Sequence, residues 1–272
     1  MQINWGRTAG WAIAGPAALA LLTGCGVVPG GSVEIMVDGT AAAAVGTTPS
    51  PAPSGSSDPS AAPPVPGAVG VGCPPGGAAV PNGAGVATTQ DLDGDGLADD
   101  LWLSRSGGRR MLGVETASGA RFFTTFTGDG LAPLANAVAG RVDGGTAVIL
   151  LDFTSQARLY TVTGCKIVKT MNQLGEQYAF DEEMTYGTGA GCPAIGAGGT
   201  RRLVGYLAKP VGSGAGYSVT RTIIELSRNG TRARNGTEEK IADGVPGSHK
   251  RVREGQEIIC GPGGRALEPA DG

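Results

Sequence analysis

The sequence Asp-Leu-Asp-Gly-Asp-Gly-Leu-Ala-Asp-Asp-Leu-Trp occupies residues 91–102, and the rest of the chain is best interpreted from it. Carboxylates stand at positions 1, 3, 5 and 9 of a short loop, and Gly96 stands at position 6, where such a loop must turn sharply. Oxygen ligands at this spacing are typical of calcium sites, in which the carbonyl of position 7 also faces the ion. We therefore predict one structural Ca²⁺ with these ligands: Asp91, Asp93, Asp95, the backbone carbonyl of Leu97, and Asp99.

The stretch departs from an EF-hand after the loop. Trp102 stands at position 12, where an EF-hand places a bidentate Glu. The residues from Asp100 onward alternate between polar and apolar types, as a β-strand does. We therefore expect a calcium loop that leads directly into a strand. The alternative is an acidic surface turn that binds no ion.

The composition indicates that only part of the chain can form a packed core. The 272 residues include 49 Gly and 18 Pro, and only 5% are aromatic. Such a composition is typical of chains with long irregular segments. The net charge of -3 is small, and no stripe of Lys and Arg is interleaved with aromatic residues. We therefore predict no nucleic-acid partner.

Residues 1–24 have the pattern of a secretory signal peptide. Arg7 supplies the positive charge, and the apolar run that follows is too short, and too interrupted by Pro16, for a permanent membrane span. The run ends in Leu22-Thr23-Gly24-Cys25, which resembles the lipobox of bacterial lipoproteins. This resemblance implies that Cys25 carries acyl chains such as palmitate and becomes the mature N-terminus. The protein would then be exported and anchored to the outer face of the bacterial cell membrane. An ordinary secretory signal is the alternative.

The remaining chain divides into three segments by composition. Residues 25–72 are rich in Pro, Ala, Gly and Ser, and they cannot bury enough apolar surface to offset the entropy of ordering. We expect them to form a disordered tether behind the lipid anchor. Residues 73–262 carry the alternating apolar pattern of a folded domain, and residues 263–272 are expected to be a flexible C-terminal tail.

The folded segment is predicted to be all-β, because no apolar stripe with helical period occurs in it. Turns are expected at residues 106–108, at Ser118-Gly119 and at Asn229-Gly230, the last being a strong hairpin signal. The predicted strands are residues 100–104, 110–116, 120–126, 147–152, 158–163, 166–170, 202–208 and 217–227.

Similar stretches recur about every 50 residues, at Gly96, Gly145 and Gly199, each before an apolar strand. The acidic loop with its strand, repeated in weakened form, resembles the FG-GAP or VCBS repeat. That family builds integrin-like β-propellers, with calcium in the loop between adjacent strands. The resemblance implies a small or incomplete propeller and the same calcium ligands; only the first copy keeps the acidic residues. A β-sandwich is the alternative architecture.

Cys25 aside, four cysteines remain, and in an exported chain an even number predicts two disulfides. Three pairings are open. We favour Cys165 with Cys192 and Cys73 with Cys260, because the second pair would join the two ends of the domain. A zinc site is the alternative, but the sequence has no Cys-x-x-Cys, and its single His is remote.

No catalytic constellation is evident. His249 lies in a basic, Gly-flanked segment, and no Gly-x-Ser-x-Gly accompanies it, so we interpret it as a solvated loop residue. We therefore predict a protein that is not an enzyme and that contacts the membrane through its lipid. Its role would be interaction with an unknown protein or glycan partner, or envelope structure. The alternatives are an exported hydrolase or carbohydrate-active enzyme with a structural calcium loop, and an accessory lipoprotein that docks another envelope protein.

Overall fold

The structure, a computed structural model, describes residues 70–128, 134–153, 156–181, 188–196, 198–212 and 216–270. The chain divides into two compact units, Met1–Ala61 and Ala62–Gly272, and every described residue belongs to the second. The predicted signal peptide, Cys25 and most of the predicted tether lie outside the described residues. Within the described ranges, no helix has the length and apolar character needed to cross a bilayer.

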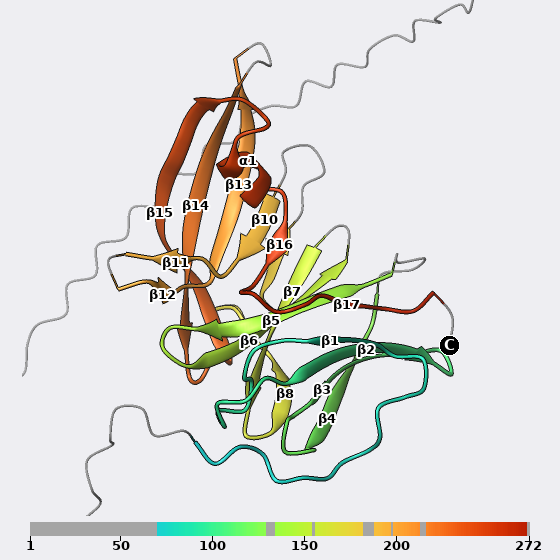
Figure 1. Cartoon of the computed structure of the whole chain (residues 1–272). Helices are drawn as coiled ribbons and strands as arrows, with labels where there is room; N and C mark the ends of the chain where they lie inside the picture. Colours follow the sequence, from blue (N-terminus) through green and yellow to red (C-terminus); the bar gives the residue numbers. More distant parts are fainter. Residues whose placement is uncertain are drawn as a thin grey trace, which may run out of the picture. The chain divides into compact units, whose positions relative to one another are not determined.

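Three antiparallel meanders of four strands follow one another along the described chain (Figure 1). The hairpins form where glycines permit a turn. Gly107 and Gly108, between the second and third strands, have φ of 56° and 74°, and two successive residues in this region suit the twist of a tight hairpin. The first meander contains β1 (Gly85–Thr88), β2 (Asp100–Ser106), β3 (Arg109–Glu115) and β4 (Arg121–Phe126).

The second and third meanders gain further strands at their edges. The second contains β5 (Asn136–Val142), β6 (Thr146–Phe153), β7 (Gln156–Thr163) and β8 (Lys166–Lys169), with β17 (Ala266–Leu267) beside β5 and β9 (Ala179–Asp181) beside β7. The third contains β10 (Thr188–Gly191), β13 (Val204–Val211), β14 (Gly216–Ser227) and β15 (Arg232–Val245), with β16 (Ile258–Ile259) parallel to β10. A separate pair, β11 (Ala194–Ile195) with β12 (Thr200–Arg201), connects β10 to β13. The helix α1 (Lys250–Glu254) precedes β16.

Strand β6 is buried on both faces of the second sheet. Its side chains point alternately to the two faces. Ala147, Ile149 and Leu151 belong to a core shared with the first sheet, and Val148 and Leu150 belong to a core shared with the third. The second sheet is therefore the middle layer between the other two. This is the reason that the sequence of β6 is an uninterrupted apolar run, as a strand buried on both faces requires.

All eight predicted strands are present, and the expected turns join them. The sequence analysis missed the other strands. Among them are β1 and β10, which begin the first and third meanders, β5, whose small residues and Gly140 weaken its pattern, and β15, the longest strand. Strand β15 lies at an edge of its sheet and is mostly exposed, so it needs no apolar alternation. The helix α1 was also missed; it has only five residues, of which Val252 is buried.

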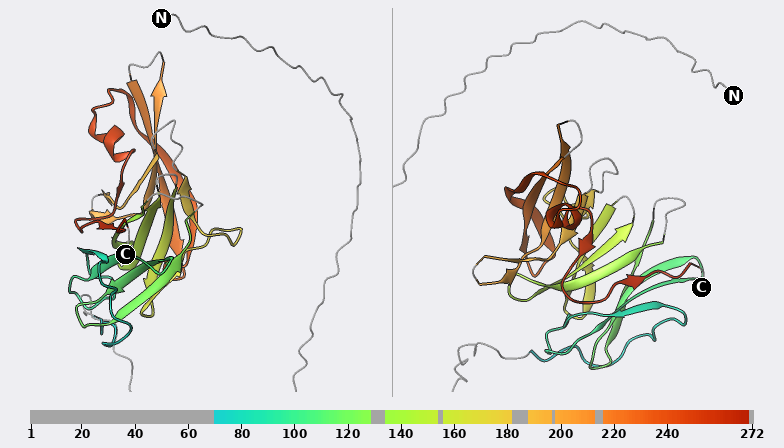
Figure 2. Two further views of the ribbon diagram at one scale, coloured as in Figure 1. Left: turned by 90° about the vertical axis from the view of Figure 1, so that its right-hand side faces the viewer. Right: turned by 45° about the horizontal axis from the view of Figure 1, so that its top comes forward.

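The C-terminal segment differs from the flexible tail predicted for residues 263–272. Its strand β17 pairs with β5 and also contacts β1 and β2, as Figure 2 shows by the red segment beside the green strands. Ala266 is fully buried, and so is the side chain of Glu268. The prediction was wrong because a short strand can be held by a sheet edge and one ion cluster without any long apolar pattern.

The all-β prediction is confirmed. In the part of the chain that the structure describes, each sheet has two edge strands, and none closes on itself.

Candidate metal centre

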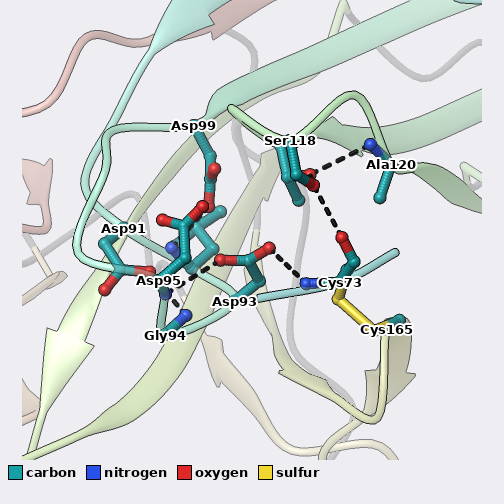
Figure 3. Close-up of a disulfide and its surroundings, with 11 residues drawn as sticks. Cys73, Asp91, Asp93, Gly94, Asp95, Asp99, Ser118, Ala120 and Cys165 are labelled. Carbon is teal, nitrogen blue, oxygen red and sulfur yellow. Dashed lines mark hydrogen bonds between the residues drawn. A yellow bond between two sulfur atoms is a disulfide. The ribbon is translucent and has the colours of Figure 1, made fainter. Parts of the chain in front are cut away.

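The acidic loop connects β1 to β2, as predicted, and three of its carboxylates converge (Figure 3). Asp91, Asp93 and Asp99 each offer an oxygen, and these oxygens all lie within 4.8 Å of one another. Calcium holds its oxygen ligands at about 2.3–2.6 Å, so two ligands on opposite sides of the ion are about 5 Å apart. The spacing of the three carboxylates therefore fits a calcium ion.

Local hydrogen bonds give the loop its shape. The amides of Gly94 and Gly96 donate to the carboxylate of Asp91, at 2.5 and 3.0 Å, and the amide of Asp95 donates to Asp93 at 3.2 Å. Gly94 and Gly96 have φ of 97° and 85°, a region that favours glycine. The sharp turn predicted at Gly96 is therefore present, and Gly94 makes a second one.

Asp95 lies outside the group of three converging carboxylates. Its carboxylate accepts the amide of Leu97 at 2.7 Å, as in an Asx turn, and it holds the end of the loop. The structure thus brings together three of the four predicted carboxylate ligands. The ligand role of the Leu97 carbonyl stays a prediction.

Asp99 is the buried member of the cluster, with 1% of its surface exposed. Its carboxylate accepts the amides of Leu92 and Ala117 at 2.6 and 3.0 Å. Burial raises the pKa of Asp99, these two amides oppose the rise, and the charges of Asp93 and Asp91 add to it. The pKa lies above its usual value because removing a carboxylate from water disfavours the charged form. A bound cation would relieve this cost.

Arg141, at the end of β5, is a partner that the sequence analysis missed. Its Nη1 lies 2.9 Å from Oδ2 of Asp91, and its Nε donates to the carbonyl of Gly145. One guanidinium beside three carboxylates leaves two negative charges, which a divalent cation would balance. Arg141 also ties the loop of the first sheet to the second sheet. The only signal in the sequence was that Arg141 lies two residues before Asp143, the acidic residue in the turn between β5 and β6.

Residues 70–73 lie against the acidic loop. The amide of Cys73 donates to Oδ2 of Asp93 at 2.8 Å, and the carbonyl of Cys73 accepts the hydroxyl of Ser118 at 2.6 Å (Figure 3). A Cβ on Gly72 would lie 2.7 Å from the same Asp93 oxygen, so only glycine fits there. The last residues of the predicted tether, 70–72, therefore belong to the folded unit.

The structure has two disulfides among the described residues, as the number of cysteines predicted, but the favoured pairing was wrong. Cys73 pairs with Cys165, and Cys192 pairs with Cys260. The first disulfide joins the segment beside the acidic loop to the turn between β7 and β8. The second joins the ends of the parallel neighbours β10 and β16. Sheet pairing, which sequence spacing does not reveal, decides which cysteines meet. Disulfides are typical of proteins outside the cytoplasm, so the pairs indicate an extracytoplasmic protein.

The turn between the first two strands of the second sheet repeats part of this arrangement. Asp143 has a φ of 50° and is followed by Gly144 at 76°. Its carboxylate lies 2.5 Å from Nε of Arg202, and its amide donates to the carbonyl of Arg201. In both sheets an acidic residue of the first turn thus pairs with an arginine from the next meander. The corresponding connection of the third sheet contains Gly196 and Gly199 and no acidic residue.

A cavity of about 460 Å³ adjoins the acidic loop. Its lining brings together loops of all three sheets, including Asp93, Arg141, Asp143, Asn229 and the disulfide of Cys73. His249 is exposed, and its Nδ1 accepts the amide of Arg251 at the start of α1, which agrees with a solvated residue.

Comparison of the chain with protein-family models, with curated proteins and with solved structures found no match.

Proposed function

We propose that this protein is a non-catalytic, calcium-stabilised surface lipoprotein whose β domain serves interaction or envelope structure. The observation that carries the proposal is that the carboxylates of Asp91, Asp93 and Asp99 lie close together. The amide of Cys73 donates to Asp93, and the guanidinium of Arg141 pairs with Asp91. These contacts link the loop to the second sheet, so a bound ion would stabilise more than the loop itself. Calcium is the natural occupant of a site made of hard oxygen ligands.

The repeated meanders support an FG-GAP or VCBS-like architecture. Gly96, Gly145 and Gly199 all lie between the first and second strands of their meanders. A propeller blade is a four-stranded antiparallel meander that packs its faces on its neighbours. We propose that the three sheets are such blades in a small or incomplete propeller. The β-sandwich alternative accounts for face-to-face packing but assigns no role to the recurrence of the turns.

The calcium proposal is tested by thermal unfolding in excess calcium and in chelator. We expect a higher melting temperature in calcium, because a ligand that binds only the folded state stabilises it by about 3–4 kcal/mol at 100 to 1,000 times its Kd. Asp93→Asn should remove most of the shift. Asp100→Asn is the matched control, since Asp100 lies outside the cluster and accepts the hydroxyl of Thr88. A melting curve that is the same in calcium and chelator would refute the site.

The lipid anchor rests on the sequence Leu22-Thr23-Gly24-Cys25, and the two disulfides support export. Two or three acyl chains on one residue would hold the protein stably at a membrane. Mass spectrometry of the mature N-terminal peptide should find acylated Cys25, and Cys25→Ala should release the protein from the membrane fraction. Unmodified Cys25 inside a longer mature chain would refute the anchor.

Proximity labelling from intact cells would identify the partner class. Labelled proteins or glycans outside the cell would favour an adhesin-like role, and co-purified envelope proteins would favour an accessory lipoprotein.

The hydrolase alternative has one supporting feature, a cavity of about 340 Å³ lined by Glu254, Glu257 and Tyr206. Its weakness is that Glu254 already pairs with Arg251 at 2.8 Å and with Lys250 at 3.6 Å. Hydrolysis of a glycan that is lost in Glu257→Gln would favour this alternative.

A further inference from the structure

Another cavity, of about 550 Å³, lies between the first and second sheets at the opposite end of β2 from the acidic loop. The turn after β2 and the ends of β3 and β4 line it, together with β7 and β8. Its lining is basic and aromatic, and among its described residues there is no carboxylate. The charged and aromatic side chains are Arg109, Arg110, Arg158, Lys169, Phe126 and Tyr160.

Strand register brings these side chains together from two sheets. Arg110 lies opposite Phe126 in the pairing of β3 with β4. Tyr160 lies opposite Lys169 in the pairing of β7 with β8, and Arg158, two residues before Tyr160, shares its face. The inner faces of both sheets therefore present cations to the same space.

Two of the cations are held in place by aromatic rings. The guanidinium carbon of Arg110 lies 4.9 Å from the ring centre of Phe126 and 5.2 Å from that of Phe153. The guanidinium of Arg158 lies 4.8 Å from the same Phe153 ring, and its Nη1 donates to the carbonyl of Thr127 at 2.7 Å. Stacking of this kind fixes the plane of each guanidinium at the wall of the cavity.

Among the cations of the lining, Arg110 already has a buried carboxylate partner. Glu268, behind the cavity lining, accepts bonds from Arg110 at 2.7 Å and from Arg105 at 3.2 Å. Arg109 and Lys169 are exposed, and among the described residues neither side chain has an ion-pair partner. Two cations at the mouth of the cavity thus remain to attract an anion.

We propose that this cavity binds an oxyanionic group, a phosphate or a sulfate. Arg109 and Lys169, the exposed cations at the mouth of the cavity, would supply the attractive charge and bind the oxygens of the anion. The group comes either from a soluble ester or from the headgroup of an anionic lipid; only the second source rests on the proposed membrane anchor.

Titration calorimetry with inorganic phosphate and pyrophosphate, at low ionic strength, tests the site on the full chain carrying Cys25→Ser, which prevents lipid attachment. We expect binding that is weakened about tenfold or more in Arg109→Ser with Lys169→Ser, as the loss of about 1.4 kcal/mol or more predicts. The matched control is Arg228→Asn with Arg253→Ser, two exposed arginines elsewhere that give the same change in charge. The control should bind as the parent does. Melting temperatures would verify that both variants fold.

Sedimentation with vesicles of phosphatidylglycerol or of phosphatidylcholine separates the two sources. Binding to phosphatidylglycerol vesicles that requires Arg109 and Lys169, with weak binding of free phosphates, assigns the site to lipid headgroups. Tight binding of free phosphate or pyrophosphate without vesicle binding assigns it to a soluble ester. No binding in either assay, or an equal loss in the control variant, would overturn the proposal. Neither assay contains calcium, so a negative result in both assays would refute the anion site without bearing on the proposed calcium site.

Discussion

Replacing Glu268 by Gln should be one of the most destabilising single changes in the described domain. The Glu268 side chain is fully buried and accepts bonds from Arg110 at 2.7 Å, from Arg105 at 3.2 Å and from the amide of Ala135 at 2.8 Å. It joins the C-terminal strand to the first two sheets. The amide of Gln would keep one acceptor oxygen and would turn an NH₂ group toward the arginines.

The expected loss is about 3–5 kcal/mol, the range observed when one partner of a buried ion pair is removed. Only 11% of the Arg110 side chain is exposed, so water cannot replace its lost counter-charge. Urea unfolding measures the loss as a change in the unfolding free energy. Glu115→Gln is the matched control. Glu115 pairs with Arg121 at 2.6 Å, but about a third of each side chain is exposed, so its loss should cost less than about 1 kcal/mol.

The same contacts predict the acid response. Burial raises the pKa of Glu268, but the bonds from Arg110, Ala135 and Arg105 outweigh it, so the pKa lies below its ordinary value of 4.5. The carboxylate therefore stabilises the fold above that pH, and the contribution is lost as the pH falls through the lower pKa of the folded state. The unfolding free energy of the parent should fall more steeply below pH 4.5 than that of Glu268→Gln. A loss no larger than that of Glu115→Gln, with equal slopes in acid, would refute the reasoning.

Three further changes test other parts of the structure. Replacing Cys73 and Cys165 by Ser should lower the unfolding free energy by about 4–5 kcal/mol, from the loop-closure cost of a 92-residue separation. It should also weaken the calcium-dependent rise in melting temperature; an unchanged rise would separate the disulfide from the loop. Gly113→Ala should cost about 1–3 kcal/mol and alter the near-ultraviolet dichroism of Trp102, because the added Cβ would lie 2.0 Å from the indole. Burial raises the pKa of Tyr178 to about 12, so its contribution to stability should be complete below pH 10 and lost as the pH rises through 12; an absorbance titration with a normal tyrosine midpoint would contradict this.

The strands predicted from the sequence are those whose buried positions produce a recognisable pattern of apolar residues. Strand β6 reads as a continuous apolar run because both of its faces are buried. Strand β15 was missed because it is an exposed edge strand, which leaves most of its positions open to polar and charged residues. Strand β5 was missed because Gly140 packs against the backbone of Cys260, 2.9 Å from where a Cβ would lie, so a larger apolar residue is excluded. A constraint from a distant segment cannot be recognised in the sequence of β5 alone.

The sequence predicted the acidic loop and the three carboxylates that converge in it, but it did not predict the residues that contact the loop from elsewhere in the chain. The bonds that shape the loop join residues two to five positions apart, such as Asp91 to Gly94 and Gly96, so spacing alone determines them. The guanidinium of Arg141 and the amide of Cys73 reach the loop from about 50 and 20 residues away. Only the packing of the sheets brings those groups to the site.

The sequence by itself determined an all-β chain, the positions of its tight turns and the acidic loop, because these depend on backbone preferences and on hydrogen bonds between near neighbours. The tertiary structure decided which cysteines pair, that Ala266 and Glu268 of the C-terminal segment are buried, and that cations from two sheets line one cavity. Each of these depends on strands that are far apart in the chain. Their contacts form only once the sheets have stacked, and no local pattern in Cys73, Cys165 or Glu268 encodes the partner that stacking supplies.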